Sequence, residues 1–275
     1  MNLALIIGNH PRNLILLKKI LNIRSIKIKK LIVHKREHLN PSPPKNLDPL
    51  LKKLWKLHFL KRNLSEKKFF NVDHKILKKV KNKTFISSAK ELNSKKIERL
   101  FIKNKYDLCI ISGIPIINES LIKKLPKFVI NLHLGLIPYY KGSITGFWPM
   151  YNLKPTMLGT TFHFIGKKVD TGEIIHQNVP RLEKSDGIHD VASKAILSAV
   201  KDIKIVIGEV NKRIKFKSNI KFDKSLEKKG KTYKSKDWKP EMLKKIYLTY
   251  NDKISKLYLE GKIKSPKPKL IKIKL

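Results

Sequence analysis

The chain has 275 residues, enough to bury a sizeable core, and its 62 Lys and Arg against 21 Asp and Glu give a formal net charge of +41. Its single cysteine, Cys109, excludes a disulfide framework and a cysteine-based metal site. No uninterrupted apolar stretch approaches the roughly 20 residues that cross a bilayer, and no secretion signal is evident at the start of the chain. We therefore expect a soluble, cytoplasmic protein.

The positive charge has two interpretations. Lys and Arg release counterions from a polyphosphate, which favours nucleic-acid binding, and a positive field attracts anionic substrates. Only seven of the 62 basic residues are Arg, however, and the Lys residues are spread along the whole chain among Ile and Asn. Because guanidinium groups are the preferred side chains for phosphate and base recognition, the compositional bias of an AT-rich genome explains this pattern better. We expect no specific DNA binding.

The first elements predict a β-α-β unit. Residues 3–8 form an apolar run typical of a buried parallel strand, residues 9–12 a turn, and residues 14–21 a helix that Asn13 can cap. Residues 27–33 form a second strand. A strand, helix and strand in succession with a right-handed crossover predict a Rossmann-like α/β fold, with a mostly parallel sheet flanked by helices.

The middle of the chain continues this alternation. Leucines at helical spacing in residues 50–60 predict an amphipathic helix, whose Trp55, His58 and Phe59 belong to the core or face an acceptor pocket. Residues 84–87 and 106–113 are predicted strands, with a helix ending near residue 103 between them. The second strand ends in small residues, which is the usual place for a ligand in an open α/β sheet, and a helix is predicted for residues 119–125.

Polar side chains follow the next apolar run. Asn131 and His133 stand two residues apart, so an extended strand points both to the same side of the sheet. A second strand-like run at residues 159–165 precedes Asp170. An amide, an imidazole and a carboxylate near strand ends are the components of a site that handles protons.

The last third of the chain changes in composition. Residues 174–179 are a predicted strand and residues 188–206 a helix. From residue 212 the chain is rich in Lys, with a helical pattern over residues 241–259 and a tail at residues 264–275 that we expect to be mobile. We predict a main domain at residues 1–210 and a partly helical C-terminal extension at residues 211–275.

Four segments in the order found here resemble the signature of the folate-dependent formyltransferases: Asn131-Leu-His133, Leu136-Ile-Pro138-Tyr-Tyr-Lys-Gly142, Gly159-Thr-Thr-Phe-His163 and Asp170-Thr-Gly172. That family includes glycinamide ribonucleotide transformylase, methionyl-tRNA formyltransferase and the sugar-nucleotide N-formyltransferases. The resemblance implies that residues 1–210 are a catalytic domain that uses 10-formyltetrahydrofolate, without a metal, to formylate a primary amine.

The resemblance also implies roles for individual residues. The catalytic residues are Asn131, His133 and Asp170. The folate would lie between two loops, formed by Ile114, Pro115, Ile116 and Ile117 and by Gly166, Lys167, Lys168 and Val169. The acceptor side would include Asn9, Arg12 and His163. For Arg12 an exposed turn residue is the more usual interpretation, and His163 is equally a packed residue beneath the site.

The acceptor stays open between an amino sugar nucleotide, a glycinamide ribonucleotide and methionyl-tRNA. The first turn carries Pro11 and lacks the second glycine with which the glycinamide ribonucleotide enzymes bind phosphate, and the C-terminal extension is short for a tRNA-binding barrel. Leu134-Gly135 also replaces the Pro-Ser often found after the histidine. The alternatives are a formyl-folate hydrolase, a zinc site at His133, His163 and Asp170, and a Lys-rich RNA-binding protein without turnover.

Overall fold

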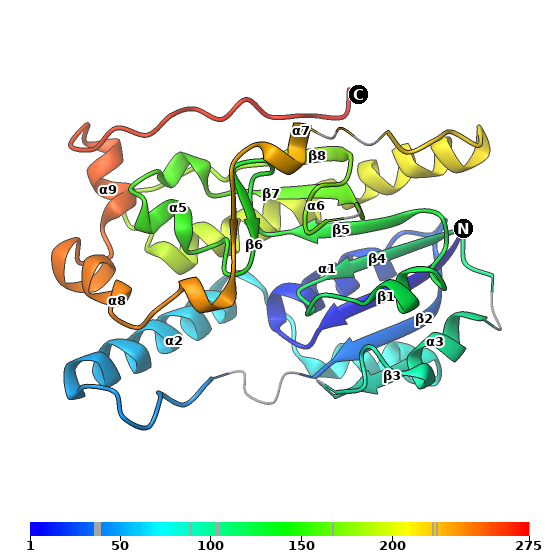
Figure 1. Ribbon diagram of the computed structural model, residues 1–275, viewed down its shortest axis with the longest axis horizontal. Helices are drawn as coiled ribbons and strands as arrows, with labels where there is room; N and C mark the ends of the chain where they lie inside the picture. The colour runs from blue at the N-terminus through cyan, green and yellow to red at the C-terminus, as the bar shows by residue number, and fades with distance from the viewer. Residues whose placement is uncertain are drawn as a thin grey trace.

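The computed structural model describes residues 1–35, 40–88, 90–102, 105–166, 168–221, 223 and 225–274. A seven-stranded sheet in the order β3-β2-β1-β4-β5-β7-β8 forms its centre (Figure 1). The first five strands of that order pair in parallel, whereas β7 is antiparallel to β5 and β8. The predicted α/β fold with a mostly parallel sheet is confirmed. The strands are β1 (Asn2–Gly8), β2 (Lys27–His34), β3 (Thr84–Ser87), β4 (Leu108–Ser112), β5 (Val129–His133), β7 (Thr160–Phe164) and β8 (Ile174–Asn178).

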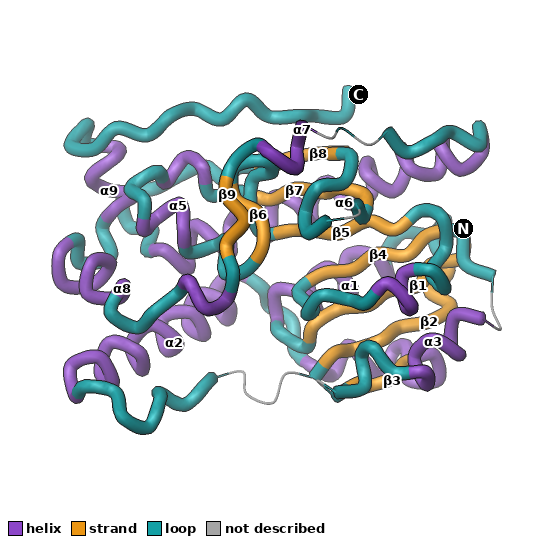
Figure 2. The backbone as a smooth tube through the Cα atoms, in the orientation of Figure 1, coloured by secondary structure: helices purple, strands orange, loops and turns teal. Residues whose placement is uncertain are grey.

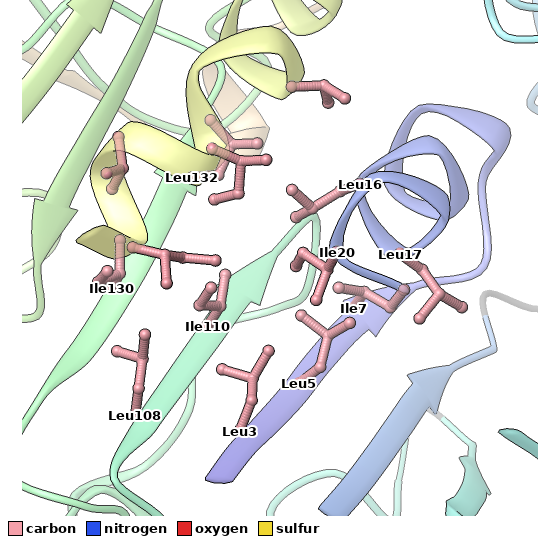
Figure 3. Close-up of a cluster of buried hydrophobic side chains, with 14 of the residues drawn as sticks. Leu3, Leu5, Ile7, Leu16, Leu17, Ile20, Leu108, Ile110, Ile130 and Leu132 are labelled. Atoms are coloured by element: carbon pink, nitrogen blue, oxygen red, sulfur yellow. The ribbon is translucent and has the colours of Figure 1, made fainter. Parts of the chain in front are cut away.

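Helices cover both faces of this sheet because its central strands are apolar on both sides. On β1, Leu3, Leu5 and Ile7 pack toward helices α1 (Pro11–Leu21) and α6 (Ile188–Lys215). Figure 3 shows them in one layer with Ile110 on the next strand and Leu132 on the strand beyond it. The intervening side chains, including Cys109 on β4, pack toward α3 (Lys95–Ile102) and α4 (Glu119–Ile122). This two-sided burial explains why the continuous apolar runs were recognisable as parallel strands.

A second apolar cluster lies beyond the sheet, where α2 (Pro49–Phe69) packs on α6. It gathers side chains from α5 (Trp148–Tyr151) and from the C-terminal helices α8 (Met242–Lys244) and α9 (Ile254–Leu259). A two-stranded sheet of β6 (Tyr140–Gly142) and β9 (Lys231–Tyr233) crosses in front, with the strands side by side in Figure 2. The remaining short elements are η1 (His74–Lys83), η2 (Pro155–Met157), α7 (Ser225–Lys228), η3 (Ser235–Asp237) and η4 (Lys245–Thr249).

The single helix predicted for residues 241–259 is wrong. The chain instead forms α8, the π-helical turn η4 and α9, with Asn251 and Asp252 in the left-handed region at φ 46° and 56°. The break places Asp252 at the start of α6, where its carboxylate accepts from the Ile188 N–H at 2.9 Å and pairs with Lys61 at 2.8 Å. A tertiary cap therefore overrides the local helical pattern.

The C-terminal extension is tied to the rest of the molecule. Helix α6 continues through the predicted boundary at residue 210 to Lys215, while the division into two domains stays a prediction. The end of the tail (red in Figure 1) lies against β8: Gln177 N donates to Ile271 O at 2.8 Å, and Ile271 N donates to Gln177 Oε1 at 3.1 Å. None of the helices in the described residues has the length and apolar character needed to span a membrane.

Candidate functional site

Strand β5 brings the two predicted polar residues to one face of the sheet. In its antiparallel pairing with β7, Asn131 lies opposite His163 and His133 lies opposite Thr161. Opposite residues in such a pair point to the same face, so Asn131, His133 and His163 form one polar group. The prediction that Asn131 and His133 share a side is confirmed.

Asp170 completes this group from the loop that follows β7. Its Oδ2 lies 3.5 Å from His133 Nδ1, and its Oδ1 lies 3.4 Å from His163 Nε2. Asn131 Nδ2 donates to Asp170 Oδ1 at 3.3 Å and lies 3.1 Å from His163 Nε2. Asp170 has φ 53°, a left-handed conformation that Asp tolerates better than most residues, so the backbone is bent to hold this carboxylate against the strand.

The surroundings keep Asp170 ionised. Burial by itself would raise the pKa of this carboxyl, but His133 and His163 and the backbone N–H of Gly142, at 2.7 Å from Oδ2, together lower the pKa below its ordinary value. A carboxylate therefore faces two imidazoles in a largely buried position. Such a group stabilises positive charge that develops nearby.

His133 is oriented by a backbone carbonyl. Its Nε2 lies 2.9 Å from Tyr140 O, which only accepts, so Nε2 carries the proton and Nδ1 faces Asp170. Gly135 makes this arrangement possible, because a Cβ atom there would lie 2.6 Å from Tyr140 O and closer still to His133 Nε2. The glycine that replaces a serine in the family pattern is thus a local requirement of the His133 contact.

His163 contacts both Asn131 and Asp170. It is buried, its Nδ1 lies 2.7 Å from Phe164 O, and its Nε2 accepts from the Asn131 amide. Both ring nitrogens therefore have protein partners, which places His163 as a packed residue beneath Asp170. The Gly142 N–H and the Tyr140 carbonyl were missed by sequence reasoning, since backbone groups leave no residue-specific signal; glycines at 135 and 142, flanking Tyr140, were the only hint.

Two loops beside this group expose apolar side chains. Gly113, at φ 64°, turns the chain after β4, and Ile116 on the loop beyond it is 72% exposed. On the loop after β7, Val169 is 38% exposed, and Gly166 packs so closely on Gly172 N that a Cβ atom would lie at 2.7 Å. Of the eight predicted folate-binding residues, Ile117 is buried and Lys167 lies outside the described residues. Exposed apolar side chains on neighbouring loops suit a flat heteroaromatic ring.

The predicted acceptor residues Asn9 and Arg12 lie apart from His163. They follow β1, and β4 and β5 stand between β1 and β7. Arg12 Nε pairs with the buried Glu66 at 3.3 Å, and its guanidinium donates to His10 Nδ1 at 3.4 Å. The cavity at Arg12, between α1, α2 and α6, measures about 20 Å³, room for a water and too little for a phosphate. The structure does not bring these three residues together.

The same distances bear on the zinc alternative. His133 and His163 each approach an oxygen of Asp170, where a shared metal would require all three to point at one empty centre. Within the described part of the chain, no group of three or more His, Cys, Asp or Glu has an arrangement suited to a metal ion.

Comparisons with known proteins give a consistent result. The family model described as formyl transferase matches residues 62–202, which is 141 of the 275 residues. Formyltetrahydrofolate deformylase 1, a mitochondrial protein of Arabidopsis thaliana, is 25% identical over 143 residues, 48% of this chain and 44% of the relative. The chain thus matches less than half the length of this curated relative.

Two solved structures share the fold. A phosphoribosylglycinamide formyltransferase from Anaplasma phagocytophilum superposes with a TM-score of 0.52 at 19% identity, covering 75% of this chain and 85% of the other. A sugar N-formyltransferase from a Shewanella species gives a TM-score of 0.53 at 16% identity, covering 86% and 78%. At these identities the likeness concerns the fold.

Proposed function

Because the chain belongs to the formyl transferase family, as the sequence motifs predicted, we propose that it transfers a formyl group from 10-formyltetrahydrofolate to a primary amine. The observation that carries this proposal is the meeting of Asn131, His133 and Asp170, which come from distant parts of the sequence. When bound, 10-formyltetrahydrofolate supplies the one-carbon unit. Ile114–Ile117 and the described residues of 166–169 would hold its ring.

Formyl transfer requires two contributions from the protein, a donor to an oxyanion and an acceptor for a proton. Formyl transfer to an amine develops negative charge on an oxygen and releases a proton from the nitrogen. The 3.5 Å between His133 Nδ1 and Asp170 Oδ2 is longer than an ordinary N–H···O hydrogen bond, so an Nδ1–H of a charged His133 remains available to a developing oxyanion. The Asn131 amide would be a second donor by exchanging its 3.3 Å hydrogen bond to Asp170 Oδ1 for one to the oxyanion.

Asp170 would serve both needs. As a carboxylate it compensates positive charge that develops on His133, and it would relay the amine proton through a water. The contacts from Gly142 N and Asn131 Nδ2 fix its orientation, so little rearrangement is needed when charge develops. We propose these three residues as the catalytic unit and His163 as a positioning residue.

The test is an acceptor assay with purified protein and 10-formyltetrahydrofolate. An amino sugar nucleotide, glycinamide ribonucleotide and methionyl-tRNA are supplied separately, and both tetrahydrofolate and the formylated product are measured. We expect product with one acceptor; release of tetrahydrofolate without any formylated amine in all three reactions would refute the transferase proposal. Pro11 and the small cavity at Arg12 weigh against glycinamide ribonucleotide.

A hydrolase is the second candidate, because the deformylase of Arabidopsis thaliana is among the relatives. The same assay separates the two, since a hydrolase releases formate and tetrahydrofolate without any acceptor. An RNA-binding protein without turnover fits less well, because it would have no use for an ionised Asp170 held between two histidines. We keep the cytoplasm as the proposed location, and a small-molecule amine or an aminoacyl-tRNA as the partner.

A further inference from the structure

A larger cavity lies at the two-stranded sheet of β6 and β9. It measures about 320 Å³, which falls within the range of small-molecule sites. Its wall is built by the Tyr139-Tyr140 turn, by Gly230 and Tyr233 around β9, and by Pro266–Pro268 of the C-terminal tail. These last segments lie outside the part of the chain that matches the family model.

Aromatic rings form one side of the cavity. Trp148, Tyr233 and Tyr140 stack in a column, with ring centroids 4.5 Å apart for the first pair and 5.9 Å for the second, and with interplanar angles of 15° and 8°. The column is buried and therefore rigid. At its rim Tyr139 is 45% exposed, an aromatic ring available to a ligand. A planar heterocycle is the natural partner of such a ring.

The charged residues of the cavity lining are basic. Lys154 and Lys267 line the cavity, and among its lining residues, all of them described, none is acidic. Asn152 also lines it, and its Nδ2 donates to the Tyr233 hydroxyl at 3.2 Å, so an amide and a phenol stand beside the rings. An aromatic surface next to two ammonium groups complements a molecule that joins a flat ring to a negatively charged group.

The tail that closes the cavity is held in place. Ser265 contacts Thr156, and farther along Lys272 Nζ donates to Asn178 Oδ1 at 2.7 Å. Strand β6 connects the cavity to the catalytic group, because Tyr140 O accepts from His133 and Gly142 N donates to Asp170. Tyr140 therefore belongs both to the cavity wall and to the contacts that orient His133.

We infer that this cavity holds the nucleoside-phosphate part of the amine acceptor, with the base against Tyr139 and the phosphates between Lys154 and Lys267. The identification of the ligand as the amine acceptor rests on the proposed function. The binding of a nucleoside phosphate in the cavity does not depend on it. A folate also joins a flat ring to negatively charged groups, and tetrahydrofolate is therefore one of the ligands to be tested.

The test is calorimetric titration of the full chain at high salt, where nonspecific anion binding by a protein of charge +41 is suppressed. The probes are uridine diphosphate, adenosine diphosphate, inorganic pyrophosphate and tetrahydrofolate. We expect one nucleoside diphosphate to bind at a single site, and Tyr139→Ala to weaken it about tenfold through loss of stacking. The double change Lys154→Glu and Lys267→Glu should abolish the binding.

Two variants serve as matched controls. Tyr139→Phe keeps the ring, and Lys269→Glu makes the same charge change on an exposed tail residue that does not line the cavity; both should bind as the wild type does. Equal affinity for pyrophosphate and the diphosphates, no saturable binding of either nucleotide, or binding unaffected by Tyr139→Ala would each overturn the inference. So would tetrahydrofolate competing with the nucleotide. Folate-dependent turnover measured in parallel shows separately whether the proposed function fails.

Discussion

At the scale of single residues, the site depends on which atom of each imidazole faces which partner. His133 gives Nε2–H to the Tyr140 carbonyl and turns Nδ1 to Asp170, while His163 places both nitrogens against protein atoms. The two histidines therefore differ in role although both are buried. We propose His133, and not His163, as the donor to the reacting oxygen.

We expect His133→Ala to lower kcat about 10²- to 10³-fold, because one donor to the developing oxyanion is lost. Steady-state kinetics measure the effect, and circular dichroism checks that the variant folds. His176→Gln is the matched control, since His176 also pairs with a carboxylate, Asp202 at 3.0 Å, but lies on β8 outside the group. A His133→Ala enzyme with near-normal turnover would remove this residue from the catalytic unit.

Gly135→Ala should reduce kcat as well, although residue 135 has no catalytic side chain. The added Cβ atom would overlap Tyr140 O and His133 Nε2, so the hydrogen bond that orients His133 must break. Proton NMR of the histidine rings should report the displacement together with the kinetic loss. Wild-type kinetics in this variant would show that the Tyr140 contact is not needed.

At the scale of elements, the predictable parts were those determined by their own sequence. Strands β1, β4 and β5 are continuous apolar runs buried on both faces, and the Asn-x-His spacing defined which side chains share a face. The three-residue strands β6 and β9 were not predicted, because they depend on each other and on Asp170. The broken C-terminal helix was mispredicted for the same reason, since Asp252 serves α6.

Helix α6 offers a prediction at this scale. Gly208 lies inside the helix, and a Cβ atom added there would meet nothing within 4 Å. Gly208→Ala should therefore raise the free energy of unfolding by about 0.5–1 kcal/mol, through higher helix propensity and a less flexible unfolded chain. Urea unfolding measures the change; a lower stability would mean that the position has a packing role. Kinetics should be unaffected.

At the scale of the whole molecule, the layer beyond the sheet contains a pair of histidines, one on α2 and one on α6. His58 on α2 lies 2.8 Å from the Tyr247 hydroxyl and 3.3 Å from His189 on α6, so three separate segments meet at one pair of imidazoles. Burial, and next the positive charge of Arg62, lower the pKa of His58 to about 3. Burial first, and then His58 and the nearby arginines, lower the pKa of His189 as well.

This cluster predicts a loss of stability in mild acid. A lowered pKa means that the unfolded chain binds more protons than the folded one below the ordinary value of 6.5, so stability is full above pH 6.5 and falls as the pH drops toward 3. His58 alone should remove up to about 2 kcal/mol between pH 7 and pH 5. Urea unfolding at both pH values should show a smaller difference for His58→Gln than for the wild type; equal differences would contradict this assignment.

The tail along β8 has one more consequence. Strand β8 is one edge of the seven-stranded sheet, and edge strands invite pairing with the strands of other molecules. Ile271 exchanges hydrogen bonds with Gln177 on β8, and Lys272 and Ile273 bind its side chains at Asn178 and His176. The end of the C-terminal tail therefore covers part of this edge and shields it from a second molecule.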